Sequence, residues 1–190
     1  MSIVLLGSTS GSCTLQEQAV AGTTTLTLPT FNGTVGLLVS GTAVASTSGT
    51  SIDFTGIPAG VRRITVLCSG VSTNGSSNLI VQLGTSGGFV TTGYLATLGS
   101  VQTSSAGTVN ATNGFIFSSV NSASVTSGTV SICTLGSNIW VYSGVTKDSS
   151  ADTNLSGGDI TLGGTLDRIR ITAINGTDAF DAGSINILYE

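Results

Sequence analysis

The residues of this chain that could carry acid–base or nucleophilic chemistry are few. Its 190 residues include nine Asp and Glu, five Lys and Arg, and no histidine. Serine is abundant, but a serine nucleophile needs a base beside it, and the one lysine, Lys147, directly precedes Asp148. With no histidine in the chain, Lys147 is the candidate base, in a Ser–Lys pair. We favour the simpler interpretation, in which Lys147 and Asp148 form a solvated loop charge pair.

Two groups of aspartates have the residue type that glycoside hydrolysis or calcium binding requires. Asp148, Asp152 and Asp159 fall in one loop-like stretch, and Asp178 and Asp181 flank an Ala-Phe pair. A glycosidase holds two carboxylates across the scissile bond, whereas calcium loops follow a twelve-residue ligand pattern that neither group matches. Aspartate also caps turns and keeps a surface soluble. We expect that role, with no enzymatic activity and no cofactor; calcium is the minor alternative.

Aromatic side chains could also bind a ligand. Trp140 and Tyr142 alternate with Ile139 and Val141, so the two pairs lie on opposite faces of a strand. If the aliphatic pair faces the core, Trp140 and Tyr142 form a candidate subunit interface or glycan contact, since exposed aromatics are frequent at such surfaces. The reverse register, with Trp140 in the core and Ile139 in an interface, is equally open.

The elements that position these side chains must be strands. The chain holds 28 Ser, 30 Thr and 27 Gly, all poor helix formers. Only 7% of its residues are charged, against roughly 25% in ordinary soluble domains. A mean hydropathy of +0.44 argues against disorder driven by charge repulsion. A net charge of −4 with five basic residues argues against nucleic-acid binding.

Apolar residues alternate with polar ones at a period of two, and Gly, Asn and Ser clusters separate the alternating runs. This pattern predicts half-buried antiparallel strands. In Asn78–Leu83, for example, Leu79, Val81 and Leu83 share one face and Gln82 lies on the other. The same pattern occurs in further segments: Val61–Cys68, Phe115–Phe117, Thr129–Leu135, Leu166–Ile174 and Ser184–Tyr189.

The first part of the chain differs in composition. Ala21–Pro29 is a short alternating segment, and Gly36–Thr50 is small and polar, as in linkers. We therefore predict an N-terminal extended arm with short strands over residues 1–47 and an antiparallel, jelly-roll-like β-sandwich over residues 48–190. The arm's candidate attachment or oligomer contacts are its hydrophobic side chains: Leu15, Val20, Leu26 and Leu28.

Cysteine usage and the N-terminus bear on the compartment. Cys13, Cys68 and Cys133 are far apart and odd in number, so free thiols are expected, with one disulfide as the minor alternative. The apolar run at Ile3–Leu6 is too short for a signal peptide or a membrane span. We expect the protein to be made in a cytoplasm and not inserted into a membrane.

Two parts of the chain are similar in amino-acid sequence to a known family. The first is GSCTLQEQAVAGTTTLTLPTFNGT at Gly11–Thr34. The second consists of these segments: Phe54–Pro58, Arg63–Val66, Ser69–Asn78, Val81–Gly88, Thr92–Tyr94 and Leu166–Tyr189. Together they resemble tailed-bacteriophage tail-fibre and related virion surface proteins, and the C-terminal segment is the most specific match.

The resemblance implies a non-enzymatic, homotrimeric structural protein of a phage virion, assembled in the bacterial cytoplasm. Its N-terminal part would attach to other virion proteins, and its β domain would face the host surface, including cell-surface polysaccharide. The chain is short and lacks a collagen-like or coiled-coil shaft, so a capsid decoration protein is the first alternative and a glycan-binding module the second. Without the resemblance, the residues predict only that the protein forms an oligomer. Lysine and proline usually keep strand edges from pairing with other chains, and this chain has one Lys and two Pro.

Overall fold

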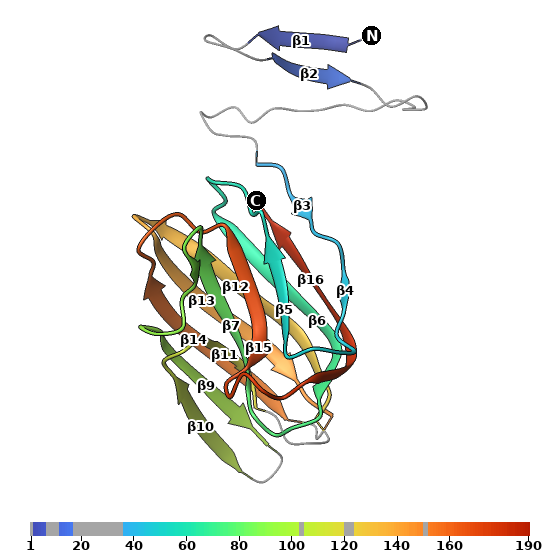
Figure 1. The fold of residues 1–190 in the computed structure, drawn as a ribbon, viewed down its shortest axis with the longest axis vertical. Helices are drawn as coiled ribbons and strands as arrows, with labels where there is room; N and C mark the ends of the chain where they lie inside the picture. Colours follow the sequence, from blue (N-terminus) through green and yellow to red (C-terminus); the bar gives the residue numbers. More distant parts are fainter. Residues whose placement is uncertain (1, 7–11, 17–35, 103–104, 120–123, 150–151) are drawn as a thin grey trace. The chain divides into compact units, whose positions relative to one another are not determined.

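The computed structural model describes residues 2–6, 12–16, 36–102, 105–119, 124–149 and 152–190, and these contain strands and no helix. The chain divides into two compact units, Met1–Val35 and Gly36–Glu190. In the first unit, β1 (Ser2–Leu6) and β2 (Ser12–Gln16) form an antiparallel pair (Figure 1). Of the candidate arm contacts, Leu15 belongs to β2 and pairs with Ile3. The other three, Val20, Leu26 and Leu28, lie outside the described residues.

The second unit contains a nine-stranded antiparallel sheet, here called the larger sheet. Its strands, in spatial order, are β10 (Ala106–Ala111), β9 (Leu95–Val101), β14 (Thr153–Thr161), β13 (Ile139–Lys147), β12 (Thr126–Gly136), β6 (Arg63–Thr73), β16 (Phe180–Tyr189) and β3 (Val39–Ser40). The ninth strand, β4 (Val44–Ala45), also pairs with β16.

A five-stranded antiparallel sheet, the smaller sheet, forms the other half of this unit. Its strands, in spatial order, are β11 (Phe115–Ser118), β7 (Leu79–Thr85), β15 (Arg168–Ala173) and β5 (Ser51–Thr55). A two-residue strand, β8 (Gly88–Phe89), pairs with the end of β7.

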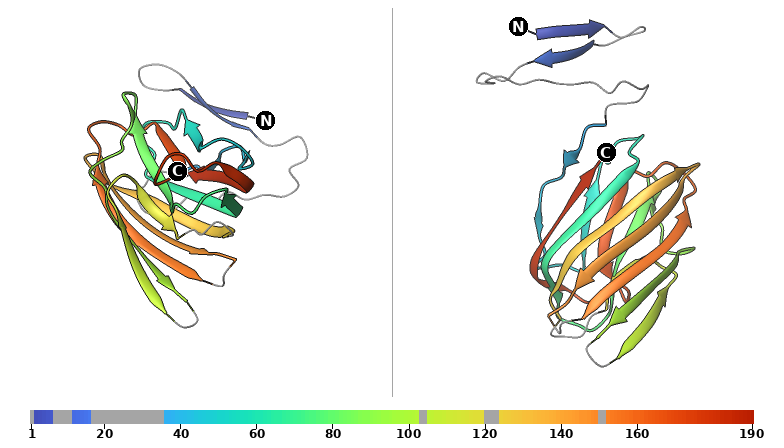
Figure 2. Two further views of the ribbon diagram at one scale, coloured as in Figure 1. Left: turned by 60° about the horizontal axis from the view of Figure 1, so that its bottom comes forward. Right: turned by 180° about the vertical axis from the view of Figure 1, so that it is seen from behind.

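The two sheets are the layers of a β-sandwich, which confirms the expected all-β antiparallel fold. Figure 1 shows the smaller sheet in front, and the right-hand view of Figure 2 shows the larger sheet from the opposite side. The larger sheet is the wider layer, and β9 and β10 continue it past the smaller sheet (Figure 1). That end of the larger sheet therefore extends beyond the two-layered part of the sandwich.

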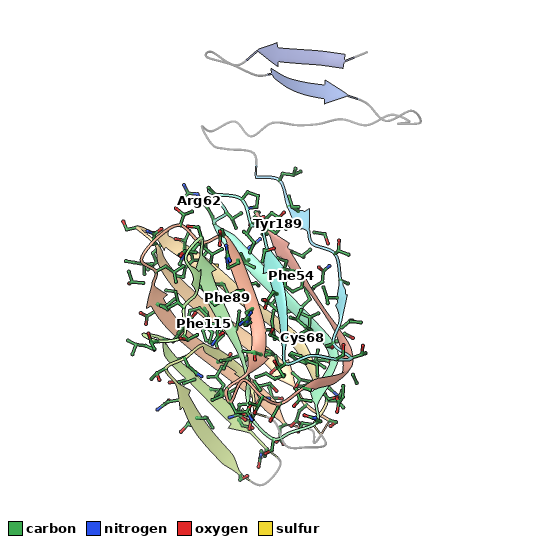
Figure 3. The ribbon with its side chains drawn as sticks, in the orientation of Figure 1. Phe54, Arg62, Cys68, Phe89, Phe115 and Tyr189 are labelled. Atoms are coloured by element: carbon green, nitrogen blue, oxygen red, sulfur yellow. The ribbon has the colours of Figure 1, made fainter. Side chains whose placement is uncertain are left out.

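The inner faces are those that the alternation predicts. Ile64 and Val66 of β6 and Ile169 and Ile171 of β15 are fully buried. Figure 3 labels Phe115, whose buried ring belongs to the same core. Full burial of such a side chain contributes about 1.5–3 kcal/mol relative to exposure. The apolar side chains on the two inner faces therefore hold the two sheets together.

Strand β7 departs from the expected pattern because it is buried on both faces. Gln82, predicted to face outward, is buried, and its side-chain amide donates to the Asn113 carbonyl at 2.9 Å. Past the end of β11, the Tyr94 hydroxyl accepts a hydrogen bond from the Leu83 amide at 2.7 Å and donates to the Val90 carbonyl at 3.1 Å. The central position of β7 between β11 and β15 thus overrides the half-buried prediction.

The boundary between the two units lies after Val35, earlier than the expected position near residue 48. The segment read as a linker contains β3 and β4, which both pair with β16. In addition, the Gly41 amide donates to the Ile187 carbonyl at 2.8 Å, and the Ser46 amide donates to the Gly183 carbonyl at 2.9 Å. Backbone pairing needs no apolar pattern, which is why composition did not reveal these strands.

Candidate interaction surfaces

Trp140 and Tyr142 lie in the core, so the protein adopts the second of the two registers that the sequence leaves open. Their exposed fractions are 5% and 4%. The Tyr142 ring stacks on Phe115 with centroids 4.4 Å apart, and its hydroxyl donates to the Ile116 carbonyl. Burial raises the pKa of this hydroxyl, so it remains a donor. The expectation of an exposed interface or glycan contact at these two rings is therefore corrected.

The cross-strand neighbours explain this register. Trp140 lies opposite Ile160 and Tyr142 opposite Ile132, and both isoleucines are buried. Large rings on the inner face fill the space between the sheets, where they remove more apolar surface from water than aliphatic side chains do. The aliphatic partner Val141 is half-buried on the opposite face of the larger sheet.

Of the two aspartates near the C-terminus, Asp178 stabilises a turn, as expected, and Asp181 lies in strand β16. The Asp178 carboxylate accepts hydrogen bonds from the Ser77 amide at 2.9 Å and the Asn175 side-chain amide at 2.6 Å. These donors lower the pKa of Asp178, the Asn175 bond being the largest cause. Asp181 accepts a hydrogen bond from the Ser72 hydroxyl. Asp178 thus holds two loops together, whereas Asp181 links the paired strands β6 and β16.

The Lys147–Asp148 pair differs from the expected solvated pair. Lys147 is exposed at the end of β13, whereas Asp148 is only 2% exposed. One oxygen of Asp148 accepts from the Asp152 amide at 3.1 Å, and the Asp148 amide donates to the Asp152 carbonyl at 3.0 Å. The Asp152 carboxylate accepts from Gln102 at 2.8 Å. This group closes the turn between β13 and β14.

The described residues contain no cluster of three His, Cys, Asp or Glu side chains that could hold a metal ion. Cys68 and Cys133 are free thiols. Burial raises the pKa of the Cys68 thiol to about 12, so it stays protonated and behaves as a small core residue.

The outer face of the larger sheet, meaning the face turned away from the smaller sheet, carries little charge. One row crosses the strands in register: Leu67, Thr129, Val145, Leu155, Gly99 and Thr108. From β6 to β10, the charged side chains on this face are Arg63, Lys147 and Asp159. Leu95 and Val101 of β9 are 68% and 52% exposed. This end of the face is uncharged and open to solvent, and its apolar side chains alternate with Thr97, Thr108 and Asn110.

Strand β10 is an unguarded sheet edge, meaning an edge without the charge, proline or covering segment that usually prevents pairing with another chain. It pairs with β9 on one side and with no described strand on the other. Its residues Ala106–Asn110 are all exposed, and the strand contains neither a charged residue nor proline. Natural edges are usually short, charged or covered. The other described edges fit that rule: β3 has two residues, β11 is buried, and β5 carries Asp53 in an ion pair with Arg170 at 2.7 Å.

A cleft of about 200 Å³, here called the end cleft, lies between three connections of the sandwich. One of these connections contains Arg62, whose amide bonds to the C-terminal residue Glu190. Its lining includes Arg62, Ser137, Asn138, Trp140 and Thr165, and no carboxylate. The Trp140 indole Nε1 is buried and meets no acceptor. The Arg62 side chain is exposed and, among the described residues, forms no ion pair. Arg62 is therefore the charged side chain that the cleft presents to solvent, whereas the Trp140 N–H lies beneath its surface.

Backbone hydrogen bonds hold the walls of the end cleft in place. Ser137 and Asn138 have φ values of 51° and 59°, so they form the two-residue turn that suits a β12–β13 hairpin. The Asn138 carbonyl accepts from the Leu162 amide at 2.9 Å. The Arg62 amide donates to the Glu190 carbonyl, and the Arg62 carbonyl accepts from Thr134 at 3.0 Å.

Of the end-cleft residues, the sequence singled out Trp140 alone, as a candidate exposed aromatic and not as part of a cleft. The one local signal was Gly136-Ser137-Asn138 between two apolar runs, which is typical of a hairpin turn. Arg62 and Thr165 are more than a hundred positions apart, so no spacing rule could join them.

Comparisons of the chain with protein-family models, curated proteins and solved structures find no match. The resemblance to tailed-phage fibre proteins therefore stays a prediction. The described part of the chain contains no helix with the length and hydrophobicity that a membrane span requires.

Proposed function

We propose that this protein is a non-enzymatic structural component of a bacteriophage particle. In this proposal it is fibre-like, its N-terminal part attaches to the particle, and its β-sandwich faces the host surface. The resemblance of Gly11–Thr34 and Leu166–Tyr189 to phage fibre proteins supports the proposal. The scarcity of charge supports it as well, because weakly charged Ser, Thr and Gly surfaces lose little side-chain entropy when copies pack together.

The observation that carries the structural role is the unguarded β10 edge beside the uncharged end of the outer face. A solvent-exposed strand of this kind presents free backbone donors and acceptors that another chain can pair with. In a homotrimer, the β9–β10 end of each copy would contact a different surface of the next copy, as in any cyclic contact that closes a ring. Assembly would then cover the edge that the single chain leaves open.

The mass of the purified full chain in solution tests this role. Light scattering coupled to size exclusion is expected to give three times the chain mass of 18.8 kDa. Thr108→Lys places a charge in the exposed edge and is expected to weaken association by about tenfold or more, since burying an unpaired charge in a contact is costly.

Thr55→Lys is the matched control. Thr55 is also an exposed threonine on an edge strand, but its strand, β5, is an edge of the smaller sheet, whereas β10 is an edge of the larger sheet. This variant is expected to keep the wild-type mass. A wild-type chain that stays monomeric at high micromolar concentration would contradict the proposed assembly.

Copy number separates the fibre-like role from the alternative of a capsid decoration protein. Quantitative mass spectrometry of purified particles, with the major capsid protein as reference, is the measurement. A few to a few tens of copies are expected for a tail location, whereas hundreds of copies would favour decoration of the head. Absence from the particle would contradict both roles.

A further inference from the structure

The larger sheet has a second exposed edge that carries no charge. At the end opposite β10, strands β3 and β4 both pair with β16, and the Gly41 amide between them donates to the Ile187 carbonyl at 2.8 Å. The segment Val39–Ala45, here called the β3–β4 edge, therefore follows β16 along its length. Its residues are exposed except for Val39 and Gly41, which are half-buried. In Figure 1 this edge and β10 lie on opposite sides of the sandwich.

The β3–β4 edge resembles β10 in the chemistry that it presents. Both Gly36–Thr50 and Gln102–Thr112 contain no charged residue and no proline. In an antiparallel ladder, the backbone groups of alternate residues point away from the partner strand. Each edge thus offers backbone donors and acceptors that no described strand uses. Large apolar side chains are exposed beside the two edges: Leu37, Leu38, Val44, Leu95, Val101 and Val109.

The edges of the smaller sheet differ from these two. Strand β11 is buried throughout, and β5 carries Asp53, whose carboxylate lies 2.7 Å from the Arg170 guanidinium. Arg170 also lies over the Phe89 ring, with its guanidinium carbon 4.1 Å from the ring centroid. A strand that paired with β5 would desolvate this ion pair, which is costly. Among the described edges, the two ends of the larger sheet are therefore the ones suited to pair with another chain.

The short length of the β3–β4 edge decides which strand it fits. Strands β3 and β4 have two residues each, so two copies of this edge would form few hydrogen bonds with one another. Strand β10 has six residues and supplies a longer template. Pairing of unlike edges is head-to-tail and builds a ring when the rotation between copies closes, whereas pairing of like edges stops at a dimer.

We propose that β10 of one copy pairs with the β3–β4 edge of the next copy, so that the larger sheets of neighbouring copies join edge to edge. This inference rests on the proposed structural role and names the surface that receives β10. Backbone hydrogen bonds supply the pairing, and apolar side chains such as Val44 and Val109 flank it. The occupant is a second copy of this chain, because one chain carries both of the unlike, uncharged edges.

Two lysine substitutions at opposite ends of the larger sheet test the contact. Thr108 and Ser40 are both exposed, and both side chains belong to the outer face. Thr108→Lys and Ser40→Lys are each expected to weaken association of the full chain about tenfold or more, because each places an unpaired charge in the contact. Sedimentation equilibrium over a range of protein concentrations measures the mass. Thr55→Lys, on the β5 edge, is the matched control and is expected to assemble as the wild type does.

An equimolar mixture of the two variants gives the sharpest result. The Ser40→Lys chain keeps an unmodified β10, and the Thr108→Lys chain keeps an unmodified β3–β4 edge, so one contact can form between them. The two remaining edges both carry lysine and do not close a ring. The mixture is therefore expected to be heavier than either variant alone and to approach twice the chain mass of 18.8 kDa.

The outcomes separate this inference from the proposed function. If Ser40→Lys assembles as well as the wild type while Thr108→Lys does not, β10 pairs with another surface; the inference is overturned and the structural role stands. If both variants dissociate and their mixture is no heavier than its components, the two edges do not meet, and the inference is again overturned. A wild-type chain that stays monomeric contradicts the proposed assembly itself, and the inference fails with it.

The fold of each variant is checked by thermal unfolding followed by circular dichroism. Ala45→Lys, at an exposed position of β4, replaces Ser40→Lys if that variant does not fold. The same comparison with Thr108→Lys then decides the inference.

Discussion

Strands β7 and β10 are both uncharged, yet they occupy opposite environments. Every residue of β7 from Leu79 to Gly84 is buried, whereas every residue of β10 from Ala106 to Asn110 is exposed. The first strand has neighbours on both sides and the second sheet across from it. The second strand has one neighbour and continues the larger sheet past the smaller one (Figure 1).

This difference shows that a strand's place in the sandwich, more than its own residues, decides what it contributes. A strand inside the sandwich is bonded on both edges and supports stability. A strand at a bare edge contributes little to the stability of the single chain and is free to pair with another chain. The same protein therefore separates a part that holds the fold together from a part that is available for contact.

A matched pair of valine substitutions gives the largest expected contrast. Val81 of β7 is 0% exposed and Val109 of β10 is 36% exposed. Val81→Ala is expected to lower the free energy of unfolding by about 2–3 kcal/mol, from lost burial and the cavity left behind. Val109→Ala is expected to change it by less than about 0.5 kcal/mol. Urea denaturation of both variants measures the difference.

The contrast would fail if the two variants lost similar amounts of stability. A large loss at Val109 in a concentrated sample alone would instead show that assembly buries β10, because association stabilises the folded chain by mass action.

Tyr94→Phe tests how the part of the β7 edge beyond β11 is satisfied. The hydroxyl satisfies the Leu83 amide at 2.7 Å just past the end of β11. Its removal leaves that buried N–H without an acceptor and is expected to cost about 1–2 kcal/mol of unfolding free energy. Hydrogen exchange at the Leu83 amide should accelerate in parallel. Unchanged exchange would mean that water replaces the hydroxyl.

The smallest expected effect concerns the loop that leads into β7. Its Ser77 amide donates to Asp178, and the hydrogen bonds to that carboxylate lower its pKa below the ordinary value of 3.8. A lowered folded-state pKa contributes stability above pH 3.8, and this contribution is lost as the pH falls below that value toward the folded-state pKa.

Asp178→Asn is the variant that checks this pH dependence. At neutral pH it is expected to be less stable than the wild type by less than about 1 kcal/mol, because solvent screens the carboxylate. In urea titrations the difference should shrink as the pH falls below 3.8, and it should vanish once the wild-type carboxylate is protonated in the folded state as well. A difference that persists unchanged to low pH would assign the effect to packing rather than charge.

Much of the fold follows from local sequence. Alternation correctly predicts the inner faces at Ile64 and Val66 and at Ile169 and Ile171, because side chains on a strand point to opposite faces. It does not predict the burial of Gln82, since period two cannot distinguish a half-buried strand from one covered on both sides. It also leaves the register of Trp140 open, because both faces of β13 offer apolar residues.

The candidate surfaces are less accessible to sequence reasoning. Few charged residues and few prolines do indicate that some edge is unguarded, but nothing in Ala106–Ala111 identifies it as the edge. The end cleft unites Arg62, the Ser137–Asn138 turn and Thr165, which come from three separate connections. Only the pairing of their strands brings these segments to one end of the sandwich.

The sequence by itself determines that this protein is a charge-poor, antiparallel β protein, because side-chain alternation and the poor helix propensity of Ser, Thr and Gly act locally. Tertiary structure alone decides which strand is central and which is bare, which face of β13 is the core, and which donors remain unpartnered. Those features depend on backbone hydrogen bonds between segments far apart in the chain, and no local pattern specifies them.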